Sequence, residues 1–239
     1  MHELVEYAWN LLGIQISEDQ LSAFEVYEQQ LIEWNDRYNL TAIDNPKQIR
    51  VKHFLDSLSC ILALRNTPTD HVVDVGTGAG FPGLPLKIIC PTINMTLIES
   101  VGKKTAFCQH IIQTINLQNV NILQERAEIL ASHPDMREKN DWAIARAVAT
   151  LPVLVEYLLP LVRVGGFALA MKGESGPAEA QSAEQAIHIL GGQIQQLIPV
   201  TLPSVEDERY LVVIEKTAAT PERYPRRVGI PAKRPLGAD

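Results

Sequence analysis

The chain has 239 residues, a formal net charge of −7 and a hydrophobic content of 46%. This length suits one α/β domain with a modest extension, and such a domain folds without disulfides. The negative charge excludes a basic field over the whole surface, so any contact with nucleic acid must be local. Three cysteines without a C-x-x-C pair predict no metal site, and they suit the reducing cytoplasm. No secretion signal and no long apolar run appear, so no membrane contact is expected.

Residues 1–66 carry apolar side chains at the three- and four-residue spacing of helices that bury one face. One stripe covers 4–12 and a second covers 21–34. Ser17, followed three residues later by a glutamine, predicts a capped start for the second helix. A third helix is expected to begin near Pro46. These patterns predict an N-terminal helical cap.

From residue 67 onward, predicted strands and helices alternate, as in a parallel sheet covered by helices. Strands are expected at 71–75, 94–99, 120–124, 141–146 and 166–172, and helices at 83–90, 102–116, 126–131, 151–163 and 177–190. The last two apolar runs, 192–200 and 209–216, lie too close for a helical crossover, so they are predicted to be antiparallel. The expected organisation is a helical cap (1–66), an α/β, Rossmann-like domain with a terminal hairpin (67–220) and a basic, proline-rich tail (221–239).

A glycine-rich turn follows the first predicted strand. Gly76, Gly78 and Gly80 alternate behind Asp74, and glycine lets a ligand lie against bare backbone. A dinucleotide fingerprint would need a glycine where Phe81 stands. The pattern D-x-G-x-G-x-G instead resembles motif I of class I S-adenosylmethionine (SAM) methyltransferases. A tight turn with no ligand is the alternative interpretation.

Downstream side chains suit the parts of a bound SAM molecule. Glu99 ends the second strand, where a carboxylate accepts hydrogen bonds from ribose hydroxyls. Ala127 and Glu128 follow the third strand and suit the rim of the adenine, while Phe81 suits an apolar floor. The alternatives are a solvated strand end for Glu99, favourable acids in a first helical turn for Glu128, and core packing for Phe81.

The fourth strand, D-W-A-I-A-R-A-V-A, carries the residues expected nearest the reaction. It lacks the [DN]-P-P-[YF] motif of amine methylation, and it lacks the cysteine that attack on cytosine C5 requires. Guanine N7 carries no proton, so its methylation needs placement and no general base. Arg146 and Lys172, at the ends of two strands, are candidates for positioning the substrate. A surface ion pair and a solvated lysine are the alternatives.

The chain resembles the bacterial small-subunit ribosomal RNA guanine-N7 methyltransferase G family, also called glucose-inhibited division protein B. The resemblance rests on W34-N-D-R-Y-N-L-T-A-I43, K52-H-F-L-D-S-L58, the segment from Val73 to Lys87, L97-I-E-S-V-G-K-K104, R126-A-E128, A145-R-A147, M171-K-G173 and Y224-P-R-R-V-G-I-P231. It implies SAM contacts at Gly76, Phe81, Glu99, Ser100, Val101, Ala127, Glu128 and Arg146. Some relatives have aspartate in place of Glu99, and either carboxylate accepts from hydroxyls.

The resemblance also implies methyl transfer to N7 of one guanine in the 16S rRNA of the small ribosomal subunit. The protein is expected to be a monomer. Asn39, His53 and Asp56 would lie in the cap, where they have either a functional or a packing role. Basic side chains of the tail, Arg223, Arg226 and Arg227 among them, are expected to contact RNA. Two alternatives stay open: a methyltransferase for a small molecule, and a SAM-binding assembly factor without catalysis.

Overall fold

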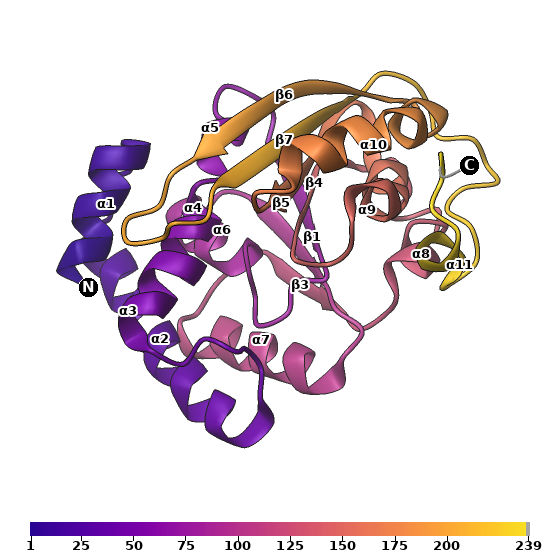
Figure 1. Cartoon of the computed structure of the whole chain (residues 1–239). Coiled ribbons are helices and arrows are strands. Elements are labelled where there is room, and N and C mark those ends of the chain that lie inside the picture. Colours follow the sequence, from indigo (N-terminus) through magenta and orange to yellow (C-terminus); the bar gives the residue numbers. More distant parts are fainter. Residues whose placement is uncertain (238–239) are drawn as a thin grey trace.

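A seven-stranded sheet forms the centre of the computed structural model, which describes residues 1–237 (Figure 1). Its strands are β1 (His71–Val75), β2 (Asn94–Ile98), β3 (Val120–Leu123), β4 (Asn140–Arg146), β5 (Val162–Lys172), β6 (Gly192–Val200) and β7 (Arg209–Lys216). Their spatial order is β3-β2-β1-β4-β5-β7-β6, and β7 alone runs in the direction opposite to the other six strands. The mostly parallel sheet with a terminal antiparallel hairpin is confirmed.

Helices cover both faces of this sheet because each central strand is apolar on both sides. In β4, Trp142 and Ile144 join one buried cluster, while Ala143 and Ala145 join the other. The crossover helices are α6 (Gly83–Ile89), α7 (Gly102–Thr114), α8 (Ala127–Leu130), α9 (Leu151–Leu158) with the 3₁₀ turn η2 (Leu159–Leu161), and α10 (Gly176–Ile189). Their places agree with the predicted alternation.

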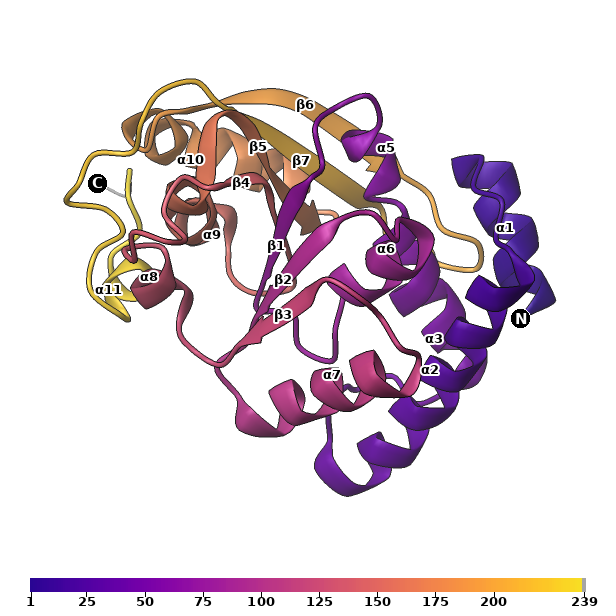
Figure 2. The same cartoon turned by 180° about the vertical axis from the view of Figure 1, so that it is seen from behind.

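The N-terminal helices lie along one side of the molecule (Figures 1 and 2). They are α1 (His2–Leu12), α2 (Glu18–Tyr38), α3 (Pro46–Ile49), the π-helical segment η1 (Arg50–Leu55), α4 (Asp56–Leu58) and α5 (Ile61–Leu64). The capping box is present: Gln20 N–H donates to Ser17 Oγ at 3.3 Å, and Ser17 N–H donates to Gln20 Oε1 at 2.9 Å. The π-helical segment was not predicted.

Aromatic side chains join the cap to the sheet domain. The Tyr27 ring of α2 stacks on Phe81 with ring centroids 5.4 Å apart, and it also packs against Phe54 at 5.3 Å. One buried apolar cluster runs across both parts. The division at residues 66 and 220 therefore stays a prediction.

The C-terminal segment crosses to the side of the molecule opposite the N-terminal helices (Figure 2). It contains one short helix, α11 (Ile230–Lys233), beside α8. Within residues 1–237, no helix is both long and apolar enough to cross a membrane. The same residues contain no group of three or more His, Cys, Asp and Glu side chains arranged to hold a metal ion.

Candidate active site

The candidate site lies at the carboxyl ends of β1, β2 and β4. The strand order reverses between β1 and β4, which both pair with parallel neighbours. Open α/β sheets bind ligands at such a switch point, because the loops there diverge and leave a crevice. The glycine turn follows β1 into this crevice, and Arg146 ends β4 beside it.

The glycine turn uses left-handed backbone at two positions that face the crevice. Gly76 has φ +69° and Gly78 has φ +62°. A Cβ on Gly76 would lie 2.6 Å from Val148 Cγ2, whereas a Cβ on Gly78 would meet no atom within 4 Å. Backbone N–H groups of Gly76 and Thr77 donate to Ile98 O at 2.8 and 3.1 Å, which fixes the turn to the end of β2. Gly78 therefore presents bare backbone to open space.

Gly80 has a different part in the turn. A Cβ there would lie 2.5 Å from both Leu84 Cδ1 and Tyr27 Oη. The Tyr27 hydroxyl donates to the carbonyl of the neighbouring Ala79. Gly80 does not appear among the residues that line the cavities around the turn. The structure thus explains this glycine by close packing against α2 and α6.

Asp74 stabilises the glycine turn through hydrogen bonds to its side chain. Its Oδ2 accepts from Thr77 Oγ at 2.6 Å and from the Gly83 N–H at 2.8 Å. Its Oδ1 is buried and accepts no hydrogen bond from the described residues. Burial, only partly offset by these donors, raises the pKa of Asp74 to about 6. The aspartate at the head of the motif therefore holds both ends of the loop.

Three cavities follow one another along the crevice. The first, about 100 Å³, is lined by Gly76, Glu99, Ser100, Ala127 and Glu128 among others. The second, about 150 Å³, shares Gly76 with the first and is also lined by Gly78 and Phe81. The third, about 330 Å³, shares His53, Arg146 and Ala147 with the second. An elongated ligand spanning the first two cavities would thus end at Arg146.

Glu99 holds the glycine turn and also faces the first cavity. Its Oε2 accepts from Gly78 N–H at 3.0 Å, and its Oε1 accepts from Val101 N–H at 2.8 Å. A carboxylate offers about four acceptor positions, so one remains free on each oxygen. Val101 is 39% exposed at the start of α7, and it does not line this cavity.

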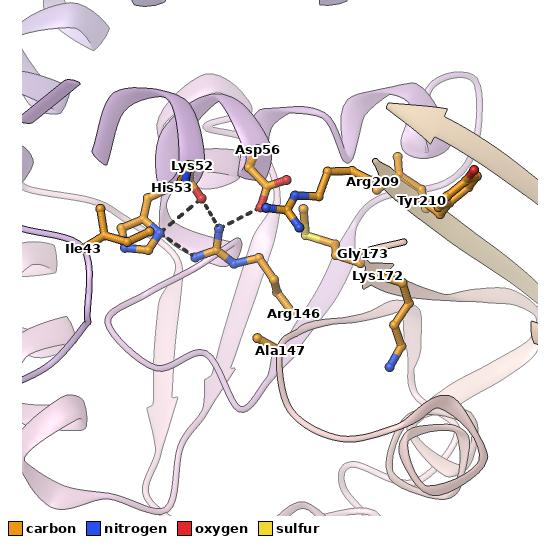
Figure 3. Close-up of a pocket in the computed structure, with 12 residues that line it drawn as sticks. Ile43, Lys52, His53, Asp56, Arg146, Ala147, Lys172, Gly173, Arg209 and Tyr210 are labelled. Carbon is orange, nitrogen blue, oxygen red and sulfur yellow. Dashed lines mark hydrogen bonds and ion pairs between the residues drawn. The ribbon is translucent and has the colours of Figure 1, made fainter. Parts of the chain in front are cut away.

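Arg146 joins β4 to the cap. Its guanidinium donates to Lys52 O and Asp56 Oδ2, both at 2.9 Å, and to His53 Nδ1 at 3.1 Å (Figure 3). It also lies 5.0 Å from the centre of the Phe81 ring. All three acceptors come from η1 and the first residue of α4. The wider π turn, often found at functional sites, presents them together toward the end of β4.

Burial and the hydrogen bond from Arg146 together determine the protonation state and the tautomer of His53. His53 Nδ1 lies 3.1 Å from Arg146 Nη2 and 3.2 Å from Lys52 O. Because a guanidinium only donates, we assign Nδ1 as the acceptor from Arg146, and Nε2–H then donates to Thr41 Oγ at 2.9 Å. Burial, with the charge of Arg146, lowers the pKa of His53 to about 3. His53 is therefore a neutral acceptor that helps to orient Arg146.

Replacement of His53 by phenylalanine is expected to make the free energy of unfolding less dependent on pH in the acid range. Between pH 6.5 and about 3, the imidazole of residue 53 is protonated in the unfolded chain but not in the folded chain. The free energy of unfolding of the wild type therefore decreases as the pH is lowered through this range. The contribution is up to about 1.4 kcal/mol per pH unit. A phenylalanine keeps the stacking on Phe81 but does not titrate. Urea unfolding at pH 6, 5 and 4 should show the two stabilities converging, whereas parallel curves would contradict this.

Lys172 lines the third cavity, but its ammonium is already engaged by other parts of the chain. Its Nζ pairs with Glu179 Oε2 at 2.7 Å and donates to Ala149 O at 2.6 Å. Figure 3 shows the ammonium pointing away from Arg146. In this position the ammonium supports the loop before α9, and the role of Lys172 in positioning the substrate stays a prediction.

Sequence reasoning gave no role to several residues of the third cavity. Lys52 and Arg209 line it, and neither forms an ion pair among the described residues. The side chain of Arg209 extends from β7 toward Asp56 (Figure 3). Ala147 lines two cavities with φ +55°, an unusual conformation for a residue with a Cβ. Only the basic character of Lys52 and Arg209 was a usable sequence signal.

Comparison with known proteins identifies the family. The model of the family rRNA small subunit methyltransferase G matches residues 20–210. A ribosomal RNA small subunit methyltransferase G from Roseiflexus castenholzii is 49% identical over 236 residues, covering 99% of this chain and 100% of the relative. One from Pelotomaculum thermopropionicum is 48% identical over 225 residues, covering 94% of each chain. The chain belongs to the rRNA small subunit methyltransferase G family.

The fold of this methyltransferase G chain agrees with the assignment. The crystal structure of a SAM-dependent methyltransferase from Aquifex aeolicus is similar with a TM-score of 0.55 at 14% identity, covering 74% of this chain and 96% of that chain. At this identity, the likeness shows the class I methyltransferase fold alone. SAM is the cofactor of the family. The bare backbone at Gly78 and the carboxylates of Glu99 and Glu128 in the first cavity fit its polar groups.

Proposed function

We propose that the protein transfers the methyl group of SAM to N7 of a guanine in 16S rRNA of the small ribosomal subunit. The observation that carries this proposal is the third cavity, which meets the cofactor crevice at Arg146 and, among the described residues that line it, offers no free carboxylate or imidazole as a general base. Its two candidate bases, His53 and Asp56, are both hydrogen-bonded to Arg146. Guanine N7 carries no proton, so its methylation needs no general base and is compatible with such a cavity.

The first two cavities are assigned to SAM. Glu99 and Ser100 would hold the ribose, and Ala127 and Glu128 would hold the adenine. Gly76, Gly78 and Phe81 would line the methionine part. This assignment places the reacting end at Arg146, because the second and third cavities share that residue. Val101 and Gly80 act on this site through the loop backbone rather than through direct contact.

When bound, SAM supplies an electrophilic methyl group on a positively charged sulfur. The chain has to place a nucleophile in line with that group and to tolerate the charge. Asp56 lies 2.9 Å from Arg146 and neutralises it, so the guanidinium does not repel a cationic ligand. The rigid network around Arg146 then fixes the wall against which the guanine lies, which supplies orientation.

Lys52 and Arg209 are proposed to bind phosphates of the RNA that flank the guanine. The cavity of about 330 Å³ is within the size range of nucleotide and small-molecule sites. Lys52 and Arg209 have no ion-pair partner in residues 1–237, so both cations are available to a polyanion, and arginine pairs with phosphate in a bidentate manner. Because the net charge of the chain is −7, such local contacts have to supply the attraction.

The direct test uses labelled SAM, purified protein and small ribosomal subunits that lack the modification, followed by mapping of the methylated base. N7-methylguanine at one site is expected. Label only in small molecules would favour the small-molecule alternative, and SAM binding without transfer would favour an assembly factor. Either result would overturn the proposal.

A Lys52→Ala/Arg209→Ala variant is expected to raise the KM for small subunits by about tenfold or more, because two phosphate contacts are lost. Its affinity for SAM should stay at the wild-type value. Arg65→Ala/Lys139→Ala removes the same charge near the amino ends of β1 and β4, and both residues are exposed. Equal KM values for the two variants would contradict the assigned phosphate contacts.

A further inference from the structure

Helix α8 needs support from outside itself. It carries Ala127 and Glu128 into the first cavity, yet it spans only four residues, and no side chain caps its N-terminus. One helical turn has almost no stability of its own, because nucleation is costly. Its position must therefore come from the residues around it.

The C-terminal segment supplies one of those contacts and is joined to a second by Arg137. Gly229 N–H donates to Glu128 Oε1 at 3.1 Å. Arg137 donates to Ala131 O at the C-terminal end of α8 at 3.3 Å and to Tyr224 O of the segment at 2.7 Å. Glu128 Oε2 accepts nothing from the described residues and stays available to a ligand. Figures 1 and 2 both show α11 beside α8.

A buried ion pair holds the C-terminal segment against α9. The Arg226 guanidinium donates from Nε and Nη2 to both oxygens of Glu156, at 2.7 to 3.1 Å, and its backbone N–H donates to Glu156 Oε1 at 2.7 Å. Glu156 is fully buried in α9. Arg226 Nη2 also donates to Arg234 O at 2.8 Å, closing a loop that contains Gly229. The loop thus holds the Gly229 N–H at a fixed place.

We propose that the C-terminal segment, residues 221–237, positions Glu128 for the adenine of SAM, so that docking of this segment sets the affinity for the cofactor. The inference rests on the proposed function through the assignment of Glu128 to the adenine. It also corrects the expectation that Arg226 contacts RNA, because its guanidinium is committed to Glu156. Arg223 and Arg227 remain exposed.

The test loosens the segment without leaving a charge buried. Glu156→Leu/Arg226→Met removes both members of the ion pair, and such replacements usually preserve the fold. Calorimetric titration with SAM, without RNA, is expected to show binding about tenfold weaker than wild type, as one oriented charged contact is lost. Arg223→Met/Arg227→Met, on exposed residues of the same segment, should bind like wild type.

A double-mutant cycle separates positioning from general loosening. Glu128→Ala should weaken SAM binding by itself, and in that background Glu156→Leu/Arg226→Met should cause no further loss. Additive losses, or wild-type affinity in Glu156→Leu/Arg226→Met, would overturn the inference.

Hydrogen exchange on the unmodified chain gives a second measurement that needs no variant to fold. SAM is expected to slow exchange in both 127–130 and 226–234. No response in 226–234 would overturn the inference even if the variants unfold. A chain that binds no SAM at all would overturn the proposed function instead, so the two failures are distinguishable.

Discussion

An Arg146→Met variant is expected to lose about 3–5 kcal/mol of folding stability and to lose nearly all methyl transfer. The stability loss follows because Asp56 would stay buried with its charge unpaired. The activity loss follows because Arg146 forms the shared wall of the cofactor crevice and the substrate cavity. Urea unfolding measures the first effect, and single-turnover methylation of small subunits measures the second.

Two further variants separate these effects. Arg146→Met/Asp56→Leu removes the unpaired carboxylate as well, so it should regain most of the stability and none of the activity. Arg163→Met breaks a comparable pair with Asp141 at 2.7 Å, near the opposite end of β4. That control should be destabilised yet transfer methyl groups normally per folded molecule. A folded Arg146→Met variant with wild-type turnover would refute the role of this arginine.

The elements of the fold could be predicted because their signals are local. Ser17 caps a helix through a residue three positions away, and the short gap before β7 excludes a crossover. The spacing of the glycines likewise reflects a loop braced by one aspartate, as Thr77 and Gly83 both donate to Asp74. In each case the partners lie within nine residues of each other along the chain, so the pattern is visible in the sequence.

The missed features depend on partners far apart in the chain. Arg146 binds acceptors that lie 90 to 94 residues earlier, and Arg226 binds a carboxylate 70 residues earlier. Composition alone predicted a solvated, RNA-binding tail, because basic residues and prolines do not reveal a buried partner. The π-helical segment was also missed, since tertiary contacts at His53 and Asp56, rather than propensity, favour its extra width.

A Gly78→Ala variant is expected to weaken SAM binding by about 100-fold or more while costing about 1–2 kcal/mol of stability. The stability cost arises because φ +62° is unfavourable for any residue with a Cβ. The affinity loss arises because the new methyl group would point into space that no protein atom occupies within 4 Å. If the cofactor lies there, the methyl group takes its place. Calorimetric titration with SAM and urea unfolding measure the two effects separately.

Gly165→Ala is the matched control for Gly78→Ala, since it isolates the backbone cost. Gly165 has φ +79°, is exposed in β5, and its added Cβ would meet only the tip of Arg163 at 3.5 Å. Both variants should lose similar stability, because the left-handed penalty belongs to the backbone and not to the site. Only Gly78→Ala should lose affinity for SAM. Equal affinities in the two variants would show that the cofactor does not lie against Gly78, and the assignment of the first two cavities would then fail.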